Sequence, residues 1–171
     1  MRPLTTFNFE VDIRLPADGT ADPNATGPAL CKAAFAECDG LELTMQSKTL
    51  TEGGNNVAQI QLVGPVSYGQ LTLKRGMTTT FDLWAWFSRV TRPDGYRLRA
   101  DVTVRVYPTR SAAEEPAMTF QLRRCLPVKM RAPALNAKDG GIAIEEMQIA
   151  YERLDVKELA GTVSDQSAPA A

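Results

Sequence analysis

Two stretches of the chain alternate strictly between apolar and polar residues, and this period of two constrains the fold more than any other feature. From Phe7 to Leu15 every odd-numbered residue is apolar and every even-numbered residue is polar or charged. The stretch from Leu98 to Tyr107 alternates in the same way. Because successive side chains of a strand point to opposite faces of a sheet, each stretch is predicted to be an antiparallel strand with one buried face.

Further strand-like runs lie between turn-forming residues. Bounded by Gly, Pro or Asn, they cover residues 41–50, 57–63, 68–74, 118–128 and 142–154. The stretch 16–28 is rich in Pro, Gly, Asp and Asn and is predicted to be a loop. About seven strands predict a mainly β fold, an antiparallel β-sandwich or partial barrel.

One segment changes to helical spacing and is predicted to form a flanking α-helix of about three turns that ends before Pro93. Thr79 is expected to cap it, and Asp82, three residues later, to complete a capping box. As a structural core helix it is expected to pack on the sheet through Leu83, Trp84, Trp86 and Phe87. A ligand-stacking role for the two tryptophans is the alternative interpretation of this segment.

Length and charge narrow the class of protein. The 171 residues fit one domain, predicted over residues 1–156, with a flexible C-terminal tail over residues 157–171. No apolar run approaches the roughly 20 residues that cross a bilayer, so no membrane anchoring is expected. The 19 basic and 20 acidic residues give a net charge of −1, and we expect no sequence-specific nucleic-acid binding. Because residues 1–10 lack a secretory pattern, folding in a cytoplasm is expected.

Residues with catalytic chemistry are few. The chain contains no histidine, which removes the commonest general base and most catalytic zinc sites. Glu145 and Glu146 are neighbours in a predicted strand, so they point to opposite faces and do not form an acid–base pair. Cys31, Cys38 and Cys125 are predicted to be reduced structural thiols. No catalytic residue, cofactor or metal site is therefore predicted.

Several short segments carry more information through their order than any one carries alone. Phe35 to Glu42 reads FAECDGLE, Glu52 to Asn56 reads EGGNN, and Leu71 to Gly76 reads LTLKRG. The aromatic helix follows, and the closing segments are PVK at 127–129, PALNA at 133–137 and the run 142–152. In this order, over roughly residues 7 to 154, the chain resembles the contractile phage tail tube protein family, the inner tube proteins of phage-tail-like contractile injection systems.

The resemblance implies the structural subunit of an inner tube, in which hexameric rings stack around a central lumen that delivers cargo or DNA. The implied partners are further copies of the chain, a sheath protein, baseplate or spike proteins, tube-cap proteins and a luminal cargo. Assembly is expected in the bacterial cytoplasm, and the tube is expected to be part of a phage virion or an injection particle. No enzymatic activity is implied.

Two departures from the family's pattern are visible. The turn-rich stretch 16–28 is longer than the usual first connection, and Tyr151 stands where a histidine is common. The sequence leaves open whether the particle is a phage or an injection system, and whether the chain is the main tube subunit or a ring that starts or caps the tube.

The stretch 46–56 is predicted to be an arm that reaches a neighbouring ring; the alternative is an exposed surface loop. With the basic pair before the helix, the predicted subunit-interface residues are Gln46, Ser47, Lys48, Glu52, Gly53, Gly54, Asn55, Asn56, Lys74 and Arg75. The alternative function is a stand-alone β-sandwich module that binds a carbohydrate or a protein through Trp84 and Trp86. An enzyme with a carboxylate or cysteine mechanism ranks third.

Overall fold

In a computed structural model of the chain, the two strictly alternating stretches are neighbouring strands. β1 (Phe9–Pro16) pairs antiparallel with β7 (Ala100–Val106), with Val11 opposite Val104 and both side chains buried. This confirms the predicted strands and their buried face. The structure describes residues 8–16, 26–33, 35–50, 59–93, 98–108, 115–134 and 141–158.

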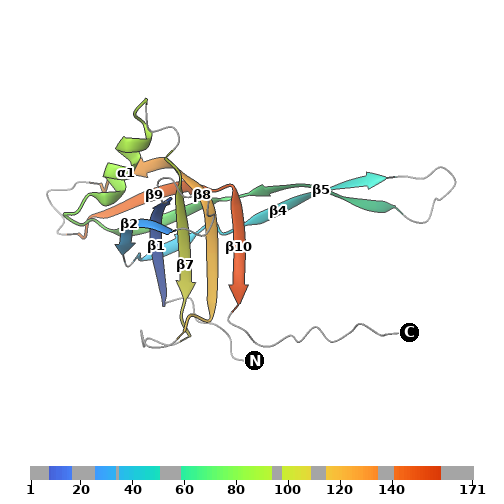
Figure 1. The fold of residues 1–171 in the computed structure, drawn as a ribbon, viewed down its shortest axis with the longest axis horizontal. Helices are drawn as coiled ribbons and strands as arrows, with labels where there is room; N and C mark the ends of the chain where they lie inside the picture. The colour runs from blue at the N-terminus through green and yellow to red at the C-terminus, as the bar shows by residue number, and fades with distance from the viewer. Residues whose placement is uncertain are drawn as a thin grey trace.

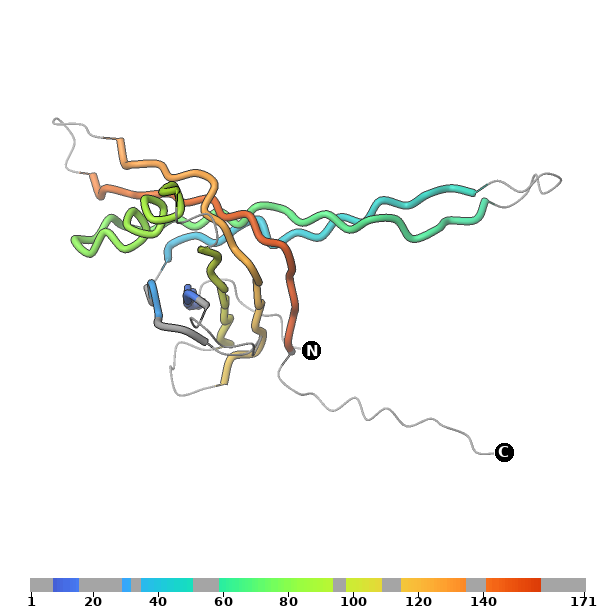
Figure 2. The backbone as a smooth tube through the Cα atoms, turned by 45° about the horizontal axis from the view of Figure 1, so that its top comes forward, coloured from blue at the N-terminus to red at the C-terminus, as the bar shows by residue number. Residues whose placement is uncertain are grey.

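The described strands form two layers that share one long strand (Figures 1 and 2). β8 (Met118–Arg131) pairs with β7 as far as Cys125 and with β9 beyond it. Arg124, at the change of layer, has a φ of 55°. The first layer consists of β2 (Thr26–Ala33), β1, β7, the first half of β8, and β10 (Arg153–Glu158). The second layer consists of the second half of β8, β9 (Ile144–Ala150), β6 (Gln70–Gly76) and β3 (Glu37–Asp39).

The hydrophobic core lies between the two layers and beneath one helix. Leu71 and Leu73 of β6 and Met147 and Ile149 of β9 are almost completely buried and belong to the same cluster as Val11 of β1. Alternate residues of each strand face this core, because the period of a strand is two. The mainly β fold with antiparallel sheets, which form an open arrangement rather than a closed barrel, confirms the predicted fold class.

Helix α1 (Asp82–Val90) packs on β8 and β2 and begins later than expected. The predicted cap at Thr79 is wrong: the N-cap residue is Phe81, with a φ of 46° and no side-chain cap bond. Asp82 starts the first turn, and its carboxylate accepts a hydrogen bond from the Leu83 N–H at 2.9 Å. The same carboxylate binds Arg75, so the helix starts where this side chain is held, two residues later than predicted.

A two-stranded hairpin projects from this body (Figure 1). β4 (Leu43–Leu50) and β5 (Ile60–Tyr68) pair antiparallel with each other and form a separate sheet. We call this hairpin the arm. It corresponds to the predicted arm, but its strands start at Leu43, before the predicted stretch. The residues 51–58 between β4 and β5 lie outside the described residues.

Two strand assignments from the sequence need correction. The predicted loop 16–28 is wrong at its end, because β2 begins at Thr26. β2 contains Pro28 and shows no alternation, and it lies at the edge of its layer, where a missing N–H donor is tolerated. The last predicted strand, 142–154, is divided into β9 and β10. β10 extends to Glu158, past the predicted start of the tail, and residues 159–171 lie outside the described residues.

The base of the arm is held by Tyr151, at the end of β9. The Tyr151 hydroxyl accepts a hydrogen bond from the Glu42 N–H at 3.1 Å and lies 3.0 Å from the Gly40 carbonyl oxygen, to which it donates. Its ring packs edge-on against Tyr68, with 5.7 Å between ring centroids. Gly40 has a φ of +88°, and a Cβ there would lie 1.9 Å from the Gln70 carbonyl oxygen. A glycine is therefore required where the chain enters the arm.

The substitution Gly40→Ala is expected to lower the free energy of unfolding by more than the roughly 1–2 kcal/mol that the left-handed backbone alone costs, because the added methyl group also collides with β6. Gly141→Ala is the matched control, since a Cβ at Gly141 meets nothing within 4 Å, and we expect a change within about 0.5 kcal/mol. Urea denaturation followed by circular dichroism measures both. Equal midpoints for the two variants would contradict this role of Gly40.

Candidate assembly surfaces

Arg75, predicted to lie at a subunit interface, has its charge inside the protein. Only 3% of its side chain is exposed. Its Nε donates to Glu145 Oε1 at 2.6 Å, and its terminal nitrogens donate to the carboxylate of Asp82. The guanidinium also lies 3.2 Å from Cys31 Sγ and 5.6 Å from the centroid of the Phe35 ring. The Arg75 cluster thus joins β6, β9, α1 and β2 within one chain.

The charges of this cluster stabilise one another. Burial alone would lower the pKa of Arg75, but hydrogen bonds to Asp82 and Glu145 raise it above its usual value. Burial likewise favours the neutral form of Asp82, and the hydrogen bonds from Arg75 outweigh it and lower the pKa of that carboxyl. Trp84 contributes a further hydrogen bond, from its Nε1 to Glu145 Oε2 at 3.2 Å.

The two tryptophans of α1 do not form an exposed stacking platform. Trp86 is fully buried together with Leu83, and Trp84 and Phe87 are half-buried. The indole N–H of Trp84 is directed to Glu145 inside the chain. This is the packing predicted for a structural core helix, and it removes the feature on which the carbohydrate-binding alternative depended.

Lys74, the neighbour of Arg75, points the other way. It lies on the exposed face of the second layer, where its Nζ donates to Glu37 Oε2 at 2.6 Å. This hydrogen bond raises the pKa of Lys74. The alternation of β6 explains the difference, because Leu71, Leu73 and Arg75 face the core while Lys74 faces outward.

The outer half of the arm has one apolar face and one more polar face. Leu50 lies opposite Ile60, and Lys48 opposite Leu62, so these residues share a face. On the other face Thr49 lies opposite Gln61, and their side chains are hydrogen-bonded at 3.2 Å. All of β4 is exposed, and Leu50, Ile60 and Leu62 are 46%, 39% and 43% exposed. Exposed apolar faces are typical of surfaces that contact another protein.

The other predicted interface residues of the arm divide into two groups. Gln46, Ser47 and Lys48 lie on β4 and are exposed. Glu52, Gly53, Gly54, Asn55 and Asn56 fall outside the described residues. The described members of the predicted interface therefore lie in two separate regions, the arm and the body, because Lys74 and Arg75 belong to β6. The assignment of this set to a subunit interface stays a prediction.

The described residues offer little for metal or thiol chemistry. Among them no cluster of three His, Cys, Asp or Glu side chains is placed to hold a metal ion. The three cysteines are free, as expected, and burial raises the pKa of Cys31 and Cys125 to about 12 and that of Cys38 to about 11. These thiols therefore stay protonated at neutral pH, where a thiolate would be needed for nucleophilic chemistry. No described helix has the length and apolarity of a membrane span.

Comparison with known proteins identifies the family to which this chain is similar. Residues 5–155 match the family described as T4-like virus tail tube protein gp19. A search of the curated proteins found no match.

Similar solved structures come from contractile particles. One is the baseplate of the anti-feeding prophage, with a TM-score of 0.74, 24% identity, and coverage of 92% of this chain and 97% of that chain. A second is the sheath-tube complex of the extracellular contractile injection system PVC, with a TM-score of 0.70, 18% identity and coverage of 92% and 93%. A third is the tube-terminating cap of the anti-feeding prophage, with a TM-score of 0.71, 16% identity and coverage of 93% of both chains. At these identities the likeness shows the fold.

Removing one charge of the Arg75 cluster is expected to destabilise the chain. Glu145→Gln should lower the free energy of unfolding by about 3 kcal/mol, because it leaves the buried guanidinium incompletely paired. Glu146→Gln is the matched control, since the next residue lies on the opposite face of β9, and it should cost under about 0.5 kcal/mol. Chemical denaturation at neutral pH measures both; a cost at Glu146 equal to that at Glu145 would speak against the cluster.

Acid should weaken the same cluster. Because the pKa of Asp82 is lower in the folded chain than in the unfolded one, its stabilisation is complete above about pH 4 and is lost as the pH falls through the folded-state pKa. Asp82→Asn removes this contribution. As the pH falls from 5 to about 2–3, the variant should therefore lose less stability than the unmodified chain. Denaturation midpoints across this range provide the test, and parallel pH profiles for the two proteins would contradict it.

Proposed function

The chain belongs to the T4-like virus tail tube protein family and is a tube subunit, and we propose that its copies close into six-fold rings that stack around a lumen. The two free edges of the second layer carry this proposal. Among the described strands, β3 pairs only with β6, and the part of β8 beyond Cys125 pairs only with β9. Both edges thus offer backbone N–H and C=O groups to another strand.

The directions of the strands favour a ring. All neighbours in the order β8, β9, β6 and β3 are antiparallel, so the two outer strands run in opposite directions. A rotation about an axis along the strands preserves these directions. β3 of one copy therefore meets β8 of the next copy in the antiparallel sense, and a closed ring leaves no edge of the second layer exposed. The baseplate structure that resembles this chain is described as 6-fold symmetrised, which supports the number six.

The arm supports the stacking of rings. An isolated two-stranded hairpin is marginally stable in water, and the arm exposes apolar side chains along its length. We propose that it lies against a copy of the chain in a neighbouring ring, where its apolar face is buried. Of the predicted interface residues, Lys48 lies on this face and is then part of the contact, whereas Ser47 lies on the opposite face with Thr49.

The proposal includes the partners of such a tube. The similar structures come from a baseplate, a sheath-tube complex and a cap, which supports a sheath, a baseplate or spike, and a cap as partners here, together with a cargo in the lumen. We place the chain in a phage virion or an injection particle, after assembly in the bacterial cytoplasm. A purely structural role without catalysis fits the absence of histidine from the sequence and the pairing of buried Glu145 with Arg75.

Negative-stain electron microscopy of the purified chain tests the proposal, and we expect rings or tubes. Ile60→Lys with Leu62→Lys should leave a folded protein but abolish tubes, because two charges enter the apolar face of the arm. Thr49→Lys with Gln61→Lys, on the other face of the same hairpin, is the matched control and should assemble. A strictly monomeric unmodified chain at high concentration would refute the tube, whereas normal tubes from the Ile60 and Leu62 variant would refute only the role of the arm.

A further inference from the structure

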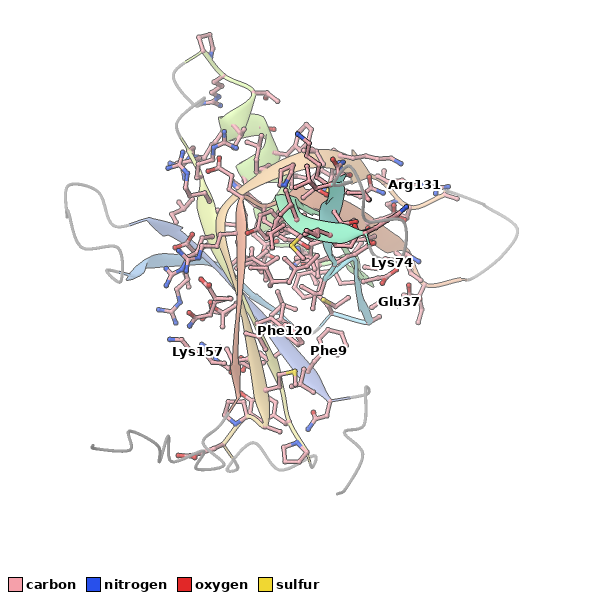
Figure 3. All side chains as sticks on the ribbon, turned by 90° about the vertical axis from the view of Figure 1, so that its right-hand side faces the viewer. Phe9, Glu37, Lys74, Phe120, Arg131 and Lys157 are labelled. Atoms are coloured by element: carbon pink, nitrogen blue, oxygen red, sulfur yellow. The ribbon has the colours of Figure 1, made fainter. Side chains whose placement is uncertain are left out.

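A row of alternating charges crosses the exposed face of the second layer from one edge to the other. β3 contributes Glu37, β6 Lys74, β9 Glu146 and β8 Arg131. Each residue lies directly opposite the next in the register of the strands. Directly opposite residues share a face of the sheet, and opposite charges in such positions attract. Figure 3 shows Glu37, Lys74 and Arg131 on the same side of the molecule.

A second row runs parallel to the first and ends in the same way. Asp39 of β3 lies opposite Thr72, which lies opposite Gln148, which lies opposite Lys129 of β8. The β3 edge thus carries two carboxylates, and the β8 edge carries two cations. In the part of the chain that the structure describes, Asp39, Lys129 and Arg131 are exposed and form no ion pair. The two edges are therefore opposite in charge as well as in direction.

We propose that these charges decide which edges meet when copies of the chain join. The acidic β3 edge of one copy binds the basic β8 edge of the next copy, so that Lys129 and Arg131 pair with Glu37 and Asp39 across the contact. This inference rests on the ring proposed above and adds the side chains that select the contact and its direction.

The same charges oppose the competing contacts. If β3 met β3, four carboxylates would face one another, and if β8 met β8, four cations would do so. Like charges directly opposite in a sheet are destabilising. Such contacts between identical edges are isologous and end in a dimer, whereas a head-to-tail contact between different edges continues until a ring closes. The polarity of the edges therefore favours rings over paired dimers.

Reversing the charge of one edge at a time tests this proposal. The basic-edge variant carries Lys129→Glu and Arg131→Glu; the acidic-edge variant carries Glu37→Lys and Asp39→Lys. Each variant alone presents like charges at every contact and should lose ring assembly. Mixed in equal amounts, the two variants present opposite charges at every contact, provided that they alternate around the ring. The mixture should therefore regain assembly, with equal amounts of both variants in the rings and with strict alternation, which an even number of subunits allows.

The matched control is Arg89→Glu with Arg92→Glu, which makes the same change in net charge at exposed positions at the end of α1. It should assemble like the unmodified chain. Circular dichroism checks that each variant is folded. If a reversed variant does not fold, the neutral pair Lys129→Gln with Arg131→Gln replaces it, and it should raise the concentration needed for assembly by about tenfold. Added salt should weaken assembly of the unmodified chain more than that of this neutral variant.

The outcomes separate this inference from the proposed function. Normal assembly by the edge variants alone, or a mixture of folded variants that stays monomeric while the control assembles, would overturn the charge selection and leave the tube intact. If the unmodified chain and the Arg89 and Arg92 control both form no rings, the ring itself fails, and the edge assignment fails with it.

Discussion

Arg75 carries a positive charge that is almost completely removed from water, and the arrangement of the elements around it depends on how that charge is satisfied. Its partners come from β9, from the first turn of α1 and from β2. A buried charge without partners costs several kcal/mol, so these elements have to be in place together. The cluster fixes the helix against the second layer, so that one face of this layer is covered and the other is bare.

The two faces of the second layer differ in the residues they carry. Towards the core, β6 and β9 place Leu71, Leu73, Met147 and Ile149, which pack within the chain. On the other face they place polar and charged residues, and the two edges of the layer stay unpaired in the part of the chain described. The arm is a second incomplete element, because it has apolar residues but no layer beneath them. We interpret both as parts of contacts that only further copies complete.

The sequence predicted the elements that depend on local pattern. Strict alternation identified β1 and β7, and helical spacing identified α1, although the capping residue was wrong because Asp82 is held by Arg75, a contact between elements. β2 was missed because its pairing with β1 is decided by neighbours and not by its own pattern. Arg75 was assigned to the surface as part of a basic pair. The alternation of Leu71, Leu73 and Arg75 in one strand could have indicated that Arg75 is buried, because alternate residues of a strand face the same side as the two leucines.

The features that the sequence did not predict depend on contacts between residues distant in sequence. Glu145 lies 70 positions from Arg75, and nothing in the local sequence links the two. The charge rows likewise appear only when four strands are in register, because their members are spread from Glu37 to Gln148. The apolar face of the arm depends on a bulge that shifts the register between Met45 and Ser47. Long-range register is therefore the part of this fold that pattern alone does not supply.

The charge rows have a consequence for anything that would travel through such a tube. The helix and the first layer fill the core side of the second layer, and this bulk needs the larger circumference, so the bare face would line the lumen of the proposed ring. Neighbouring strands are about 4.8 Å apart, and the sign of the charge changes from strand to strand along the row through Glu37. Fields from charges that alternate over so short a distance cancel within a few ångströms of the wall. A passenger near the axis would meet a wetted surface without a net pull or push along its path, whatever its own charge.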